Sequence, residues 1–299
     1  MSTDIKAIHD SMLVYPKEKI LFILSAVFSV ILWISLVIAT LGFGLLLIGI
    51  GALIFLFMKH LFMARIKGFG ICVSENQYPE MYEQVTRIAN DMGLKNIPAI
   101  YILQMEGILN AFALNIFSRR FVIVTTATLD ACAEDTDALA FILAHEVSHL
   151  ARKHTNRIEF LLPSRIIPWL GNAYSRACEY TADAYGAKYG TTSLEKAQQG
   201  ISILATASIA RSRSLNAQAY INQARDVRSF WPAVANTNST HPFTSLRYAR
   251  IASLAQQTPS HPRSNIFGFL LAPLFSIYTL FVIYIVVVIA VSLSNASQM

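Results

Sequence analysis

Charged side chains are scarce in this sequence of 299 residues: they make up 14% of it, whereas a soluble globular protein carries about 25%. Two stretches, residues 20–58 and 264–299, contain no Asp, Glu, Lys or Arg. The residues between them have an ordinary mixed composition and are numerous enough for one domain with its own core. The scarcity of charge excludes an ordinary soluble protein and favours a membrane protein with one water-exposed domain.

Three further features that the sequence lacks narrow the class of protein. None of the three cysteines belongs to a C-x-x-C pair, as expected of a domain in a reducing compartment. No basic stripe with interleaved aromatic residues is present, so we expect no nucleic-acid partner. The first apolar stretch begins only at residue 20, is too long for the core of a signal peptide and is followed by no A-x-A-like site. A cleavable signal peptide is therefore not expected.

The stretch 20–58 is about twice as long as one membrane-spanning helix needs to be. We predict two helices, at 20–39 and 41–58, that turn near residues 40–44. The alternative is a single long tilted helix, which would overshoot the bilayer. The second apolar stretch predicts a third span at 265–294, which crosses once rather than folding back as a re-entrant hairpin.

Basic residues flank the predicted spans, and the turn between the first two spans carries none. By the positive-inside rule, residues 1–19 and the domain at 59–264 are expected in the cytoplasm, with the tail 295–299 outside. The net charge of +6 matches the anionic surface of a lipid bilayer, the expected partner of these spans. We expect an integral protein of a bacterial inner membrane, and its oligomeric state stays open.

The central domain is predicted to be α+β, mostly helical, with a small sheet. Period-3.6 and period-2 apolar patterns, punctuated by turn residues, indicate its elements. Helices are predicted at 78–94, 134–155, 173–189, 193–212 and 244–256, strands at 97–104, 107–114 and 120–129, and a loop at 236–240.

Residues 144–150 read AHEVSHL, a candidate zinc motif inside the predicted helix 134–155. On a helix, His145 and His149 project from one face and can bind a single metal ion, with Glu146 beside them as a general base. The alternative is an amphipathic helix that carries these polar residues by chance. A catalytic zinc site needs a third protein ligand, so the rest of the chain decides between the two.

The metzincin motif, H-E-x-x-H-x-x-G-x-x-H, does not supply that ligand, because Arg152 and Thr155 stand where it has glycine and histidine. His154 stands one residue before the position at which that motif has its third histidine. We predict that His154 is a solvated residue on a basic helix end.

The third ligand can also be a glutamate on a second helix, and the stretch SRACEYTADAYG at 175–186 contains one. Glu179 and Asp183 are one turn apart and share a helix face. Glu179 can bind zinc, while Asp183 can accept the second ring N–H of a zinc histidine. A solvated face is the alternative for two acids, but their small apolar neighbours favour packing against another helix. Cys178, the competing ligand, points about 100° away and is predicted to be core.

Four motifs together resemble the HtpX-like integral-membrane zinc peptidases, which are gluzincins related to the CAAX prenyl proteases. They are H-E-x-x-H, S-R-x-x-E-x-x-A-D, LNAFAL at 109–114 and STHPFTSLRYARI at 239–251. The resemblance implies a zincin-type peptidase domain with one Zn2+ per chain. It implies His145, His149 and Glu179 as zinc ligands, Glu146 as general base and Asp183 as the support of a zinc histidine.

The resemblance also implies roles for three residues that no pattern by itself singles out. Asn110 would lie on an edge strand that holds the substrate backbone by β-augmentation. His241 and Arg247 would face the substrate cleft, with His241 as a donor to the developing oxyanion.

The chain departs from the HtpX-like pattern in two places. Those proteins have a second apolar hairpin between the two ligand motifs, whereas residues 157–175 here are too short and too charged to span twice. We interpret this segment as interfacial or as a lid. Tyr248 stands where an isoleucine follows the motif arginine.

The expected function is zinc-dependent endopeptidase activity on polypeptides, such as misfolded or membrane proteins. One alternative is a CAAX-type prenyl-protein peptidase, which the small number of predicted spans disfavours. The other is a catalytically silent, zinc-stabilised membrane scaffold, which would be expected to lack a ligand or the base. A transporter is excluded, since no predicted span contains a charged residue.

Overall fold

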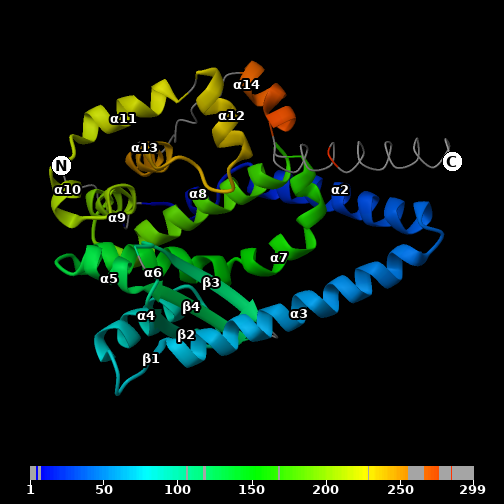
Figure 1. Cartoon of the computed structure of the whole chain (residues 1–299). Helices are drawn as coiled ribbons and strands as arrows, with labels where there is room; N and C mark the ends of the chain where they lie inside the picture. The colour runs from blue at the N-terminus through cyan, green and yellow to red at the C-terminus, as the bar shows by residue number, and fades with distance from the viewer. Residues whose placement is uncertain are drawn as a thin grey trace.

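The structure is a computed structural model that describes residues 5, 8–105, 107–116, 119–167, 169–227, 229–254, 266–275 and 284. A long helical hairpin extends from a domain in which helices surround a small sheet (Figure 1). The chain begins with α1 (Asp10–Leu13), α2 (Glu18–Ala39), α3 (Phe43–Phe69), β1 (Ile71–Val73), α4 (Pro79–Asp91), β2 (Ala99–Leu103), β3 (Ala111–Ile116) and β4 (Arg119–Thr125). It continues with α5 (Thr126–Cys132), α6 (Thr136–Ala151), α7 (His154–Phe160), η2 (Leu162–Ile166), α8 (Gly171–Gly190), α9 (Leu194–Thr206), α10 (Ile209–Arg213), α11 (Ala217–Asp226), α12 (Phe230–Asn238), α13 (Thr244–Leu254), α14 (Ile266–Leu271) and η3 (Ala272–Phe275).

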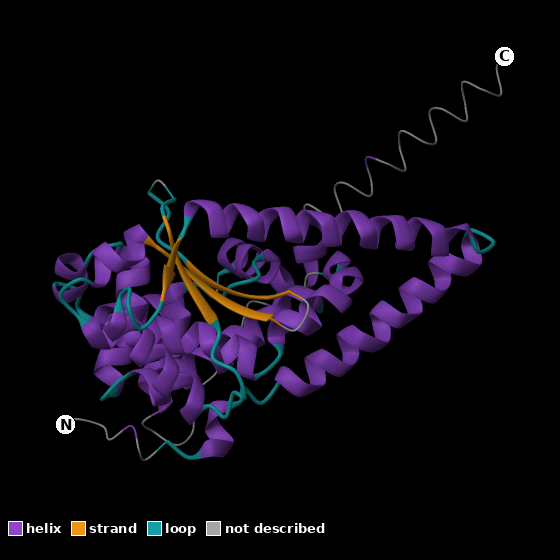
Figure 2. Cartoon of the chain, turned by 90° about the horizontal axis from the view of Figure 1, so that it is seen from below, coloured by secondary structure: helices purple, strands orange, loops and turns teal. Residues whose placement is uncertain are grey.

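The predicted hairpin is present as α2 and α3. Both helices are long and apolar enough to cross a membrane, and most of their large apolar side chains are exposed. They meet at a tight turn in which Leu41 and Gly42 have positive φ angles of 50° and 91°, and the Thr40 Oγ1 accepts a hydrogen bond from the Gly44 N–H at 2.7 Å. From this turn the two helices diverge and reach the domain at separate places (Figure 2).

The predicted third span, 265–294, lies largely outside the described residues. Of it, α14 and η3 are described, and they pack against α12. The Asn238 side chain at the end of α12 donates a hydrogen bond to the Ala272 carbonyl at 3.0 Å.

The last turns of α3 form one layer of the domain. Met63 and Ile66 are buried against Ile116, Phe121 and Ile123 of the sheet. A helix with the composition of a membrane span therefore continues directly into the packing of the central domain.

The sheet has four strands in the order β1-β2-β4-β3, one more than predicted. β2 and β4 are parallel, and the outer strands β1 and β3 are antiparallel to their neighbours. Side chains of β4 alternate between two cores: Phe121 and Ile123 pack with α3, while Val122 and Val124 pack with α4 and α6.

The predicted strand 120–129 is wrong in its second half, because α5 begins at Thr126. The Thr128 hydroxyl there lies 3.0 Å from the Thr125 hydroxyl and donates to the Asn110 carbonyl at 2.9 Å. Such local side-chain hydrogen bonds compete with a continuing strand.

Several helix predictions also need correction. The predicted helix 134–155 ends at Ala151, and the chain turns at Lys153, whose φ is 61°. The predicted helix 193–212 breaks at Ala207, with φ 52°, into α9 and α10. Residues 236–238 end α12 instead of forming a loop, and α11 was not predicted.

Segment 157–175 lies at the base of α2. Leu161 is buried together with Tyr174 and Cys178, and Leu21 and Phe22 of α2 pack against them. Trp169 and the apolar side chains of α7 and η2 that point away from this cluster are exposed. Both interpretations of this segment, interfacial and lid, stay predictions.

Small residues let α6 and α8 approach closely, and this contact brings the two ligand motifs together. A Cβ at Gly190 would overlap the Ala140 carbonyl oxygen, and one at Gly186 would lie 3.0 Å from the ring of Phe141, which is fully buried.

Gly190→Ala is expected to destabilise the domain by about 1–3 kcal/mol, since a methyl group would have to push α8 away from the backbone of α6. The melting temperature of the detergent-purified protein checks this. Gly68→Ala is the control, because a Cβ there meets nothing within 4 Å. Equal melting temperatures for the two variants would contradict the expectation.

Candidate metal centre

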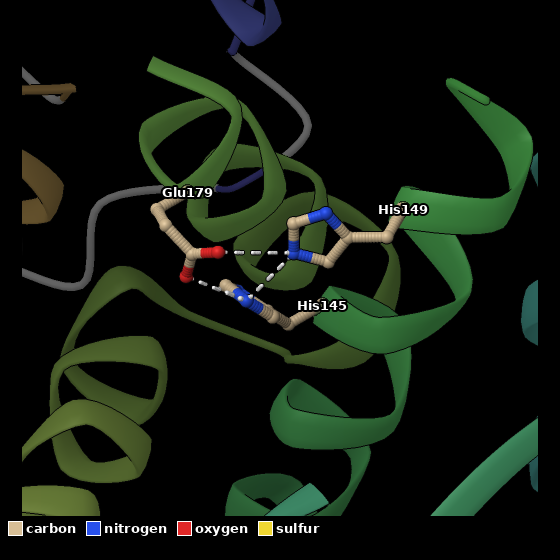
Figure 3. A group of neighbouring side chains, drawn as sticks. All are labelled: His145, His149 and Glu179. Carbon is tan, nitrogen blue, oxygen red and sulfur yellow. Dashed lines mark hydrogen bonds and ion pairs between the residues drawn. The ribbon is translucent and has the colours of Figure 1, made fainter. Parts of the chain in front are cut away.

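Three potential ligand atoms converge between α6 and α8 (Figure 3). The Nε2 atoms of His145 and His149 are 3.2 Å apart. The carboxylate of Glu179 lies across from them, with Oε2 3.3 Å from His145 Nε2 and Oε1 3.5 Å from His149 Nε2. All three residues are at most 9% exposed, so the group is nearly enclosed by protein.

The donor set and its spacing fit zinc. Two imidazole nitrogens and a carboxylate oxygen are zinc ligands, and a tetrahedral zinc bound at about 2.0–2.1 Å places its ligand atoms about 3.3–3.4 Å apart. The three observed separations, 3.2, 3.3 and 3.5 Å, lie close to that value, and the two that involve Glu179 end on different oxygens of its carboxylate. These residues can therefore hold the ion with little rearrangement.

Asp183 lies behind His145, on the side away from the other ligands. Its Oδ1 is 3.0 Å from His145 Nδ1, so an Nδ1–H donated to this oxygen leaves Nε2 as the nitrogen that can bind a metal. Burial raises the pKa of Asp183, but the Arg247 guanidinium and the hydrogen bond with His145 together outweigh burial and hold that pKa below its ordinary value. A charged carboxylate is the form that orients the histidine best.

Arg247 is buried and bound to Asp183 through two hydrogen bonds, from Nε to Oδ2 at 2.9 Å and from Nη2 to Oδ1 at 2.6 Å. Its Nη2 is also 3.5 Å from His145 Nδ1. The guanidinium thus lies behind the histidine and anchors Asp183. Its expected contact with substrate stays a prediction.

The two candidate histidine ligands differ in protonation. Burial lowers the pKa of His149 to about 3, which keeps this imidazole in the neutral form that binds metal. Burial acts in the same direction on His145, but hydrogen bonds with Asp183 and Glu179 raise its pKa to about 10. A metal that binds at His145 must therefore displace a proton.

Glu146 lies on α6 next to the first histidine and faces the sheet. Burial raises the pKa of its carboxyl to about 7, against the opposing charge of His145 and a backbone hydrogen bond from Ala113 of β3. A carboxylate with a pKa near neutrality suits a general base.

Asn110 comes immediately before β3, the outer strand of the sheet. Its backbone N–H donates to the Thr125 hydroxyl at 3.1 Å and its carbonyl accepts from the Thr125 N–H at 3.0 Å, while its side chain is exposed. Among the described strands, none pairs with the other edge of β3. Asn110 itself lies outside β3 and pairs with Thr125, so its expected role on a strand that holds the substrate stays a prediction.

His241 lies on the solvent side of the ligand group. Its Nε2 is 3.6 Å from Glu179 Oε1, and its side chain is 66% exposed. The loop that carries it is tied to α8 by Arg176, whose Nη1 donates to the carbonyls of Thr237 at 2.7 Å and Ser239 at 2.6 Å. Arg176 is the arginine of the S-R-x-x-E motif, and no role was predicted for it.

The prediction for His154 is wrong: this residue is fully buried. Because the chain turns back at Lys153, the ring of His154 lies beneath the end of α6, and its Nδ1 is 3.1 Å from His149 Nδ1. Its Nε2 is 3.3 Å from Oε1 of Glu18, the first residue of α2, which is 2% exposed. Neither residue was predicted to belong to the site.

The model of peptidase family M48 matches residues 75–161 and 159–255, which include both ligand motifs. The chain belongs to peptidase family M48, a family of metallopeptidases that contains the HtpX-like enzymes and relatives of the CAAX proteases. The resemblance inferred from the motifs is thereby confirmed. Comparisons with curated proteins and with solved structures found no match.

Proposed function

We propose that this protein is a zinc-dependent endopeptidase, anchored in a membrane by α2 and α3, that hydrolyses peptide bonds in misfolded or membrane proteins. The observation that carries the proposal is the triangle of His145, His149 and Glu179, with Glu146 beside it. Family membership supports the reaction class, and the substrate range is the part that the experiment below must establish.

Each residue of the site has a proposed catalytic role. Zinc held by the three ligands would supply Lewis-acid activation of water and of the scissile carbonyl. Glu146 accepts a proton from the attacking water and delivers it to the leaving amine. The open edge of β3 binds the substrate backbone as an added strand. His241, on the solvent side of the ligands, donates a hydrogen bond to the oxyanion as it develops.

The membrane anchor is supported by the exposed apolar surface of the hairpin and by the charges at its base. Lys17 and Lys19 precede the apolar part of α2, and Lys59 follows that of α3. By the positive-inside rule, the hairpin would cross from the cytoplasmic side and return, which leaves the peptidase domain in the cytoplasm of a bacterial cell.

Removal of zinc is expected to abolish cleavage of unfolded casein by the detergent-purified protein, because three side chains alone cannot activate water at neutral pH. Peptide release is measured before and after treatment with a chelator, and again after zinc or magnesium is added back. Zinc should restore activity, whereas magnesium, which prefers oxygen ligands, should not.

Two outcomes would point elsewhere. Cleavage that persists in protein shown by metal analysis to be free of zinc contradicts the proposal. Zinc binding with no cleavage of casein, but with cleavage of a farnesylated peptide, would identify a prenyl-protein peptidase. Zinc binding with no cleavage of either substrate would indicate the scaffold.

A further inference from the structure

A line of buried polar side chains connects the candidate metal ligand His149 with the first residue of the hydrophobic hairpin. His149 directs Nε2 to the other ligands, and its second nitrogen, Nδ1, lies 3.1 Å from Nδ1 of His154. The far nitrogen of His154 lies 3.3 Å from Oε1 of Glu18. His154 and Glu18 are 0% and 2% exposed, so these contacts are shielded from water.

One arrangement of protons satisfies every atom in this line when both rings are neutral. The Glu18 carboxylate can only accept, so it accepts the Nε2–H of His154. The Nδ1 of that ring is then an acceptor, and it accepts the Nδ1–H of His149. His149 is left with an unprotonated Nε2, which is the atom that faces His145 and Glu179.

The Glu18 carboxylate is itself held in place from several sides. Its Oε2 accepts a short hydrogen bond from the hydroxyl of Thr181 on α8, and its Oε1 is 3.3 Å from Nη2 of Arg152. The same threonine oxygen accepts the Tyr15 N–H at 2.9 Å, just before α2. The start of the hairpin is therefore fixed to α8 at a position two residues after Glu179.

We propose that His154 and Glu18 are positioning residues of the metal centre, which hold His149 in the tautomer that presents Nε2 to zinc. This inference rests on the proposed function and extends it. His145 is oriented by Asp183 within the domain, whereas His149 is oriented by His154, which is itself held by Glu18 of the first candidate membrane helix. The hairpin is thus a structural part of the metal centre in addition to its proposed role as an anchor.

The test is zinc affinity, measured by competition with a chromophoric chelator on the full-length protein in detergent. Loss of a partner that orients a metal-binding histidine costs about 10–100-fold in metal affinity. We therefore expect His154→Phe, which fills the space but accepts no hydrogen bond, to bind zinc about 10–100-fold more weakly. His154→Gln, whose amide can accept from His149 and donate to Glu18, should bind zinc more tightly than His154→Phe.

The zinc affinity of a second variant, Glu18→Leu, is measured in the same way, and Glu159→Gln is its control. Glu159 is a carboxylate on α7 whose ion pair with Lys59 is partly exposed. Glu18→Leu should weaken zinc binding, and Glu159→Gln should leave it unchanged. Circular dichroism of each variant establishes that the helices are intact, and Glu18→Leu decides the test if His154→Phe fails to fold.

Each result decides the inference. Zinc affinity of His154→Phe within about threefold of the wild type would overturn it, and so would equal losses in His154→Phe and His154→Gln. If Glu18→Leu must decide, an unchanged zinc affinity of that variant overturns it. A wild-type chain that binds no zinc would instead refute the proposed function, so the two failures are distinguishable.

Discussion

Glu146→Gln is expected to lower the catalytic rate on casein by about 10²–10⁴-fold, the contribution of a positioned general base, while zinc binding stays at the wild-type level. The amide has nearly the shape of the carboxylate, so it can still accept the hydrogen bond from Ala113. It cannot accept a proton from water. The measurement is kcat on a fluorogenic casein substrate, together with zinc content per chain.

Glu134→Gln is the control for this variant. Glu134 is an exposed glutamate just before α6, with its carboxylate paired to Arg213 at 3.0 Å. Its replacement should leave both kcat and zinc content unchanged. A Glu146→Gln variant that cleaves casein as fast as the wild type would eliminate Glu146 as the base, whatever its zinc content.

Glu179→Ala is expected to lose zinc, with an affinity reduced by more than the roughly 100-fold upper range seen when only a supporting partner of a ligand is removed. Two imidazole nitrogens 3.2 Å apart would remain, with no anionic ligand opposite them. Because a ligand that binds only the folded state stabilises it, zinc should raise the melting temperature of the wild type but not of Glu179→Ala.

The comparison for Glu179→Ala is Glu195→Ala, which removes an exposed glutamate from the first turn of α9. That variant should retain the zinc-dependent rise in melting temperature. The assignment of Glu179 as a ligand would have to be abandoned if Glu179→Ala kept full zinc content.

The sequence was informative wherever a functional pair lies within one helix. His145 and His149 are one turn apart, as are Glu179 and Asp183, so helical periodicity alone places each pair on one face. The hairpin was predictable for a similar reason, since the length of an apolar run is compared with the fixed thickness of a bilayer. These patterns determined the candidate ligands, the expected chemistry and the two hydrophobic helices.

The sequence was less informative about element ends, which depend on single backbone turns. Left-handed conformations at Lys153 and Ala207 end two predicted helices early, and neither residue type signals such a turn. Extending the helix through residue 155 placed His154 in solvent. The turn at Lys153 is what returns that ring to the second nitrogen of His149.

The sequence by itself therefore determined the metal-binding motifs, the peptidase family and the hydrophobic hairpin, because each depends on spacing along a short stretch of chain. The sequence also predicted Asp183 as the support of a zinc histidine, but only the tertiary structure decided that this histidine is His145, that Arg247 holds Asp183 and that His154 lies behind His149. Arg247 reaches Asp183 across 64 positions of sequence, and Glu18 reaches His154 across 136. No local periodicity connects residues so far apart; they meet because α13 and the start of α2 both pack against α8.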